Sequence, residues 1–381
     1  MINIHKHCGI YLLVVVLMLL TLGYVMLWST TGPAARQMAN PYNFVGRQGI
    51  WIVLGLVGMI VAACYDYNHY QKHAWWIYGM ACFMLFLTLI PHIGANINGA
   101  RRWIRLGSIT LQASEFGKLA TVILISHWLT LYYRKLQTWN WGFVFPWVLA
   151  VVPILLIGVA PDLGTATLLG MVVLAMMFIA GTRMRYLVPG VVTALGCLTV
   201  AVVMMPERLA RIFAFLWPEL NKTGKGYQVY QGLIALGSGG MNGVGLGESR
   251  QKFKYIPEAH TDFIFPVIGE ELGLWATLLI VFAFLVLMMS GLMIVMTAKN
   301  KFGQMLASGI TLMICLQAII NIGVVTSMIP NKGMPLPFIS YAGNNLLINL
   351  IGIGILLNIY RQGNYVPDHD PLTVPEYTPK V

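Results

Sequence analysis

Residues 272–297 read LGLWATLLIVFAFLVLMMSGLMIVMT, an apolar run without a single charged side chain. A helix of this length exceeds the roughly 30 Å of hydrocarbon in a bilayer, because each residue adds about 1.5 Å. The whole chain shares this character: 58% of its 381 residues are hydrophobic and 10% are charged, and the mean hydropathy is +0.73. Soluble globular domains carry far more charge. The sequence therefore predicts a polytopic membrane protein.

Ten apolar runs are long enough to cross a membrane, which predicts an all-α fold of about ten transmembrane helices. Their approximate ranges are 10–28, 48–64, 74–91, 116–133, 143–160, 163–181, 186–205, 272–297, 304–329 and 341–360. Only Pro161 and Asp162 separate the fifth run from the sixth, so we expect a tight hairpin there. Residues 1–361 are expected to form one transmembrane domain, and the proline-rich residues 362–381 a disordered cytoplasmic tail.

The distribution of charge predicts how the chain is oriented. An even number of crossings places both termini on one side, and the short loops on that side are basic, with Lys72, Arg134, Lys135, Arg183, Arg185, Lys299 and Lys301. The positive-inside rule makes that side, and hence both termini, cytoplasmic. The formal net charge of +11 and a basic surplus in the outer loops favour contact with anionic lipid headgroups or phosphates. No nucleic-acid-binding motif accompanies this charge, so nucleic acid is not an expected partner.

A polar segment at 206–262 interrupts the apolar pattern and predicts a large extracytoplasmic loop between the seventh and eighth helices. It ends in the sequence YIPEAHTDFIF, which contains Glu258, His260 and Asp262. A carboxylate that enters an apolar segment gains a raised pKa and suits general-base chemistry. Asp262 is the candidate base, and capping of the eighth helix is its alternative role. Oxygen ligands for a divalent cation are present without a diagnostic spacing, so a divalent cation stays open as a cofactor and we assign no metal ligand.

Basic residues flank the loop that follows the third apolar run. Arg102 and Lys118 would suit a phosphate, because a guanidinium offers a planar donor fork and an ammonium a point charge. Arg102 beside Trp103 fits an interfacial anchor equally well, and Lys118 could instead snorkel to the interface. Glu115 lies one turn from Lys118 and would hold it in the interior. Asp162 begins the sixth run, where it is either a helix cap or a functional ionisable group.

Two further outer segments have unusual composition. Residues 237–249 contain six glycines, which let the backbone approach a ligand closely or form a flexible turn. They match neither a phosphate-binding loop nor a dinucleotide fingerprint, so ATP and NAD are not expected. Glu270 and Glu271 are expected to pair internally with basic residues. The last outer loop, residues 330–345, contains three prolines and polar groups that line a cavity or join helices.

Several stretches together resemble the SEDS family (shape, elongation, division and sporulation), whose branches are FtsW, RodA and SpoVE. They are GARRWI at 99–104, QASEFGK at 112–118, PDLGT at 161–165, GYQ at 226–228, ALGSGG at 235–240, residues 257–273, and PLPFISY at 335–341. The chain departs from the family's usual pattern at Ala113 and at Ala342 and Asn344. The wording around Glu258 and Phe338 is closer to the FtsW branch, which favours a role in division over elongation.

The resemblance implies a glycosyltransferase with a GT-C-like helical fold that polymerises the lipid-linked disaccharide lipid II. Asp262 matches the family's essential aspartate, and Arg102 and Lys118 match basic positions implicated in activity. The candidate substrate-binding residues are Arg102, Trp103, Glu115, Lys118, Asp162, Glu258, His260, Lys332 and Ser340. The implied partner is a class B penicillin-binding protein, a transpeptidase, among other division or elongation proteins, and the implied location is the bacterial inner membrane.

Three classes of function stay open at this point. In the first, Asp262 takes the proton from the acceptor hydroxyl during an inverting attack, and outer basic residues neutralise the departing pyrophosphate. In the second, the chain is a lipid II flippase with a polar path through Lys118, Asp162, Gln317, Asn321 and Asn344. In the third, it is a non-catalytic scaffold that recruits a transpeptidase.

Overall fold

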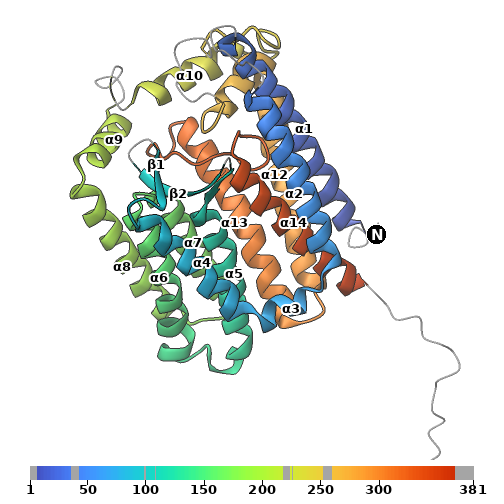
Figure 1. The fold of residues 1–381 in the computed structure, drawn as a ribbon, viewed down its shortest axis with the longest axis vertical. Coiled ribbons are helices and arrows are strands. Elements are labelled where there is room, and N and C mark those ends of the chain that lie inside the picture. The colour runs from blue at the N-terminus through green and yellow to red at the C-terminus, as the bar shows by residue number, and fades with distance from the viewer. Residues whose placement is uncertain are drawn as a thin grey trace, which may run out of the picture.

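The computed structural model describes residues 7–35, 43–97, 100–107, 109–217, 224, 226–251 and 260–364. Every one of the ten predicted spans coincides with a helix (Figure 1). These helices are α1 (Cys8–Ala35), α2 (Asn43–Cys64), α4 (Ala74–Leu89), α5 (Ala113–Leu131), α6 (Phe145–Val159), α7 (Leu163–Ile179), α8 (Met184–Val203), α12 (Ile264–Thr297), α13 (Lys301–Val325) and α14 (Gly343–Asn364). By length and composition, six helical segments in the described ranges could each cross a membrane. The expected multi-pass helical fold is confirmed.

The two ends of the bundle carry different elements. Figure 1 places the start of α1 and the end of α14 at one end, together with the short helix α3 (Tyr67–Lys72). The opposite end carries α9 (Pro206–Leu216), α10 (Tyr227–Gly239) and a small sheet. The helix α13 runs through the middle of the bundle, and it packs against α5, α7, α12 and α14. The predicted tight hairpin at Pro161 and Asp162 connects α6 to α7.

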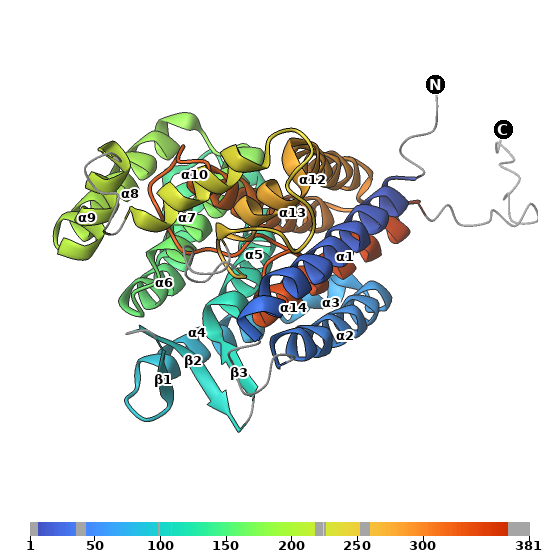
Figure 2. The same cartoon turned by 90° about the horizontal axis from the view of Figure 1, so that it is seen from above.

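The sheet is a feature that the sequence analysis did not predict. Strands β1 (Gly94–Ile97), β2 (Ala100–Leu106) and β3 (Ile109–Gln112) pair antiparallel in that order. Seen from above, the strands project from the side of the helical bundle near α4 (Figure 2). The central strand turns Ile104 into the core and leaves Arg101 and Arg105 exposed, as expected of a strand with one buried face. This sheet places Arg102 and Trp103 at the end of the bundle away from the termini.

The glycine-rich segment packs on a break in α12. Gly273 has φ 78° and ψ −171°, which interrupts the helix after its first turns. The amides of Val244 and Gly245 donate to the carbonyls of Glu270 and Glu271 at 2.9 and 3.0 Å, and so bind the backbone that precedes the break. A Cβ atom on Gly243 would lie 2.2 Å from the Glu271 carbonyl oxygen. The glycines therefore serve a close backbone approach to a helix.

Gly243→Ala is expected to destabilise the protein strongly. Its φ of 77° already costs an L-residue about 1–2 kcal/mol, and the added methyl group would overlap the Glu271 carbonyl. Gly107→Ala is the matched control, since Gly107 has a similar φ of 61° and open space around it. The measurement is thermal unfolding of both variants in the same detergent, and equal losses of stability would contradict the role assigned to close packing.

Candidate functional site

Asp262 lies at the end of the bundle opposite the termini, two residues before α12 begins. Its side chain is half-buried, and the residue at the N-cap position of α12 is Phe263 rather than Asp262. A Cβ atom on Gly333 would lie 2.6 Å from Asp262 Oδ2, so the carboxylate packs directly on the backbone of the last loop. Asn321 Nδ2 donates to the Asp262 backbone oxygen at 2.9 Å. Both the last loop and α13 therefore fix this residue.

His260 connects the same segment to the start of α14. Its ring lies 5.1 Å from that of Phe44 and 5.7 Å from that of Tyr341, measured between ring centroids. The Tyr341 amide donates to the His260 carbonyl at 3.0 Å. Glu258 lies outside the described residues. His260 and Asp262 thus lie on one short segment that α2, α13 and the last loop hold in place.

Lys118 and Glu115 form a buried ion pair, as their spacing predicted. Lys118 Nζ lies 2.9 Å from Glu115 Oε2, and the two side chains are only 2% and 4% exposed. A buried charge is tolerated only when it is paired and hydrogen-bonded. Lys118 also donates to Gln317 Oε1 at 2.9 Å, and Asn345 Nδ2 donates to Glu115 Oε2 at 2.8 Å. The pair is therefore buried and hydrogen-bonded to amide side chains of α13 and α14.

Arg102 and Asp162 together fix the turn between α6 and α7. The Arg102 guanidinium donates to the carbonyl of Ala160 at 3.2 Å and to that of Pro161, and it lies 3.9 Å from Asp162 Oδ2. Asp162 is the N-cap of α7, because its carboxylate accepts from the amide and hydroxyl of Thr165. The capping interpretation of Asp162 is confirmed. Arg102 remains 30% exposed, so part of its guanidinium faces outward.

The last loop contributes the cation Lys332 and an internal hydrogen bond made by Ser340. Lys332 is half-buried, its Nζ lies 3.5 Å from Thr167 Oγ1, and burial lowers its pKa. Ser340 is buried, and its hydroxyl accepts from the Leu336 amide at 2.8 Å, which closes the turn of the loop. Lys332 thus directly precedes Gly333, on which Asp262 packs, whereas Ser340 shapes the loop that carries Lys332 and Gly333.

Two arginines of α9 belong to the same end of the bundle and were not identified from the sequence. Arg208 and Arg211 are one helical turn apart, and both are half-buried. Burial, and then the charges of Arg211 and Arg102, lower the pKa of Arg208. The signal that could have revealed them is their spacing of three in an amphipathic stretch that begins with Pro206. Three guanidiniums thus gather near one another at this end.

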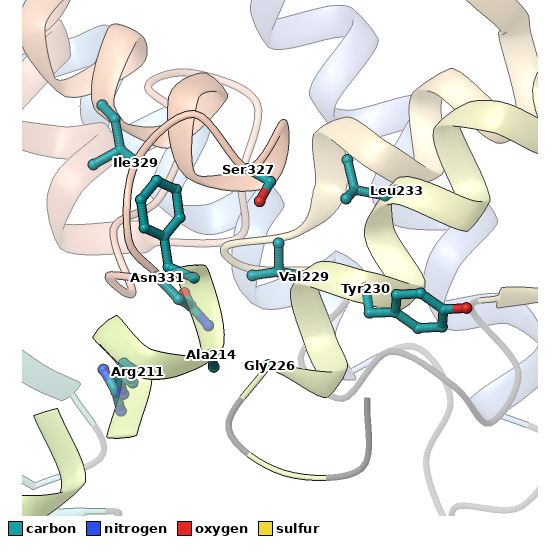
Figure 3. A pocket seen from close by; sticks show the side chains of 10 residues that line it. Arg211, Ala214, Gly226, Val229, Tyr230, Leu233, Ser327, Ile329 and Asn331 are labelled. Carbon is teal, nitrogen blue, oxygen red and sulfur yellow. The ribbon is translucent and has the colours of Figure 1, made fainter. Parts of the chain in front are cut away.

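A small hollow lies beside these residues. It encloses about 370 Å³ including its open mouth, between α9, α10 and the last loop. Figure 3 shows its lining, with Arg211 from α9, Tyr230 from α10, Ser327 from the turn after α13, and Asn331 from the last loop. Asn331 directly precedes Lys332, so the hollow adjoins the segment that touches Asp262.

Glu270 has partners other than those expected. Its carboxylate accepts from the Ser249 hydroxyl and from the Arg250 amide at 3.0 Å, rather than from a basic side chain. The Ser29 hydroxyl donates to Glu271 at 2.6 Å. Within the described ranges, no group of three or more His, Cys, Asp or Glu side chains lies close enough to hold a metal ion.

Comparison with known proteins identifies relatives of this chain. Residues 10–365 match the family model described as cell cycle protein, which covers FtsW, RodA and SpoVE. The chain is 40% identical over 92% of its length to a probable peptidoglycan glycosyltransferase FtsW of Geobacter metallireducens, covering 94% of that protein. It is 37% identical over 93% of its length to the stage V sporulation protein E of Bacillus subtilis, covering 97% of that protein.

Solved structures share the fold. A chain from a study of polymerization and crosslinking by a peptidoglycan synthase complex has a TM-score of 0.75 and 24% identity, covering 93% of this chain and 97% of that one. The rod shape determining protein RodA of Thermus thermophilus has a TM-score of 0.67 and 24% identity, with the same two coverages. The family match over residues 10–365 and the relatives at 40% identity show that this chain belongs to the FtsW, RodA and SpoVE family of cell cycle proteins, the SEDS family.

Proposed function

We propose that the chain is a peptidoglycan glycosyltransferase that polymerises lipid II at the outer face of the bacterial cytoplasmic membrane. Relatives that match over nine-tenths of the chain bear that enzyme's name. The observation that carries the proposal is the half-buried carboxylate of Asp262, held against Gly333 at the end of the bundle opposite the termini. A carboxylate placed there meets the sugar headgroup of a lipid whose tail lies in the bilayer.

In this mechanism Asp262 is the general base. It takes the proton of the acceptor hydroxyl as that oxygen attacks the anomeric carbon of the donor, and the carbon–oxygen bond to the pyrophosphate breaks with inversion. General-base assistance contributes roughly 10²- to 10⁴-fold in rate. The donor carries its own leaving group, so the reaction requires no nucleotide. This agrees with the lack of a phosphate-binding loop in the sequence.

The leaving pyrophosphate needs cations, and we propose that Lys332, Arg208, Arg211 and the exposed part of Arg102 supply them. Guanidiniums and ammoniums stabilise charge that develops on a departing phosphate. His260 and Trp103 would contact the sugars at the end of the bundle opposite the termini. We assign a structural role, which holds the substrate-binding residues in place, to Glu115, Lys118, Asp162 and Ser340. Each of these four is buried and hydrogen-bonded within the protein.

Lys332→Met is expected to raise KM for the lipid-linked donor about tenfold or more, because a charge-assisted hydrogen bond contributes roughly 1.5–3 kcal/mol. Burial lowers the pKa of Lys332 below the ordinary value of about 10.4. The wild-type KM should therefore rise with pH as Lys332 loses its proton, on the alkaline side but earlier than for an exposed lysine. The measurement is KM against pH for the wild type, Lys332→Met and Lys332→Arg. An unchanged KM in Lys332→Met would remove this role.

The same proposal includes a partner and an orientation. A relative by fold comes from a peptidoglycan synthase complex in which polymerization and crosslinking are coordinated. We propose a class B penicillin-binding protein as the partner of this chain, with both termini in the cytoplasm and a role in division. The basic short loops at the end of the bundle that carries the termini support this orientation.

Reconstitution into lipid vesicles tests the proposal against the flippase alternative. Labelled lipid-linked disaccharide is placed on one leaflet, and the products are separated by size before and after muramidase digestion. A polymerase yields long glycan that digestion returns to disaccharide, whereas a flippase yields only unchanged monomer on the opposite leaflet. Monomer alone would overturn the proposed function.

A further inference from the structure

Two sets of buried hydrogen bonds, joined through the peptide link between Met334 and Pro335, connect the Lys118–Glu115 pair to the segment that carries Asp262. Lys118 has only donors, so it must face the oxygen of the Gln317 amide. The Gln317 nitrogen is thereby turned the other way, and it donates to the Pro335 carbonyl at 2.8 Å. The ion pair thus fixes the direction of an amide that holds the last loop.

One turn further along α13, Asn321 bridges two segments. Its Nδ2 donates to the Met334 carbonyl at 2.6 Å and to the Asp262 carbonyl at 2.9 Å. Met334 directly follows Gly333, the residue on which the Asp262 carboxylate packs. Asn321 therefore connects the backbone of Asp262 to the backbone of the last loop. The Asp262 carboxylate packs on that same loop, at Gly333.

We infer that Asn321, with Gln317 behind it, is a positioning residue for the Asp262 carboxylate. This inference rests on the proposed role of Asp262 as the base. Both amides are buried, at 2% and 1% exposure, so they act through Asp262 rather than on substrate. A general base must lie within hydrogen-bond reach of the proton that it takes, and small displacements are costly in rate.

The test is steady-state polymerisation by Asn321→Leu, which keeps the volume and removes both donated bonds. The expected result is a fall in kcat of about 10- to 100-fold with KM within about threefold of the wild type. Gln317→Met removes the bond to Pro335 and should also lower kcat with little change in KM, but by a smaller factor. This variant tests the inference if Asn321→Leu does not accumulate.

The matched control is Asn358→Leu. Asn358 is an equally buried amide near the C-terminal end of α14, at the end of the bundle that carries the termini. It donates to the Ala63 carbonyl at 2.7 Å and accepts from the Tyr67 amide. It should lose stability while keeping its kcat. A merely structural role for Asn321 predicts the same pattern for both variants, and this outcome would overturn the inference.

A second comparison isolates the coupling to Asp262. In the Asp262→Glu background the carboxylate is on a longer and more flexible side chain. Asn321→Leu should therefore lower kcat by a much smaller factor there than in the wild type. Equal losses in the two backgrounds would contradict the inference. Retained activity in Asp262→Asn would instead remove the proposed function of Asp262, and the two failures are thereby distinguished.

Discussion

Replacing Asp262 by asparagine should lower the rate of glycan polymerisation by roughly 10²- to 10⁴-fold, the usual contribution of a general base. Asparagine keeps the size of the side chain and its fit against Gly333, but its amide takes no proton at neutral pH. The hydrogen bond from Asn321 goes to the backbone oxygen of residue 262, so the substitution leaves it in place. The loss is therefore expected in kcat and not in folding.

Two measurements check this prediction. The first is the melting temperature of Asp262→Asn, which should match that of the wild type. The second is the rate of Asp262→Glu against pH, which should keep partial activity and show an acidic limb, because a protonated carboxyl is no base. Full activity of Asp262→Asn at an unchanged melting temperature would exclude the base role of Asp262.

Lys118→Met is the second change with a large expected effect. It leaves the Glu115 carboxylate buried without its cation, and breaking a buried ion pair costs about 3–5 kcal/mol. It also removes the donor that orients Gln317, so activity should fall together with stability. Thermal unfolding in detergent and polymerisation by the same preparation measure the two losses.

Neutralising both partners separates the two effects. Lys118→Met combined with Glu115→Gln leaves no uncompensated charge, and replacing a buried pair as a whole is often nearly neutral. The double variant should regain most of the stability but not the full rate, because the Gln317 amide is no longer oriented by Lys118. Lys72→Met removes an exposed lysine and should change stability by less than about 0.5 kcal/mol. A single Lys118→Met variant as stable as Lys72→Met would contradict this account.

Hydrophobicity was sufficient to predict the bundle but not all of its boundaries. The eighth helix was expected to begin at residue 272, because the charged Glu270 and Glu271 directly precede the uncharged apolar run. In the structure it begins at Ile264. Inside the helix, the Glu271 carboxylate accepts from the Ser29 hydroxyl, 242 residues away, and the Glu270 carboxylate accepts from the Ser249 hydroxyl. Strands β1 and β3 were missed because four-residue strands carry almost no periodic signal, and the seven-residue β2 has an arginine at three of its positions.

The candidate site was predictable only where its contacts are local. The pairing of Glu115 with Lys118 and the capping by Asp162 follow from spacings of three residues and from helix starts. The partners of the ion pair, Gln317 and Asn345, are 199 and 230 residues away from the residues that they bind. No spacing rule reaches that far. The burial of this pair among amide side chains is therefore visible only in the fold.

In the proposed mechanism, the carboxylate of Asp262 is the base for glycan polymerisation by this chain. The most direct test of this role is the initial rate of glycan formation from purified lipid-linked disaccharide in detergent, without nucleotide, for the wild type and Asp262→Asn side by side. The account predicts long glycan from the wild type and about 1% of that rate or less from the variant. No polymer from the wild type, or equal rates from both proteins, would contradict it.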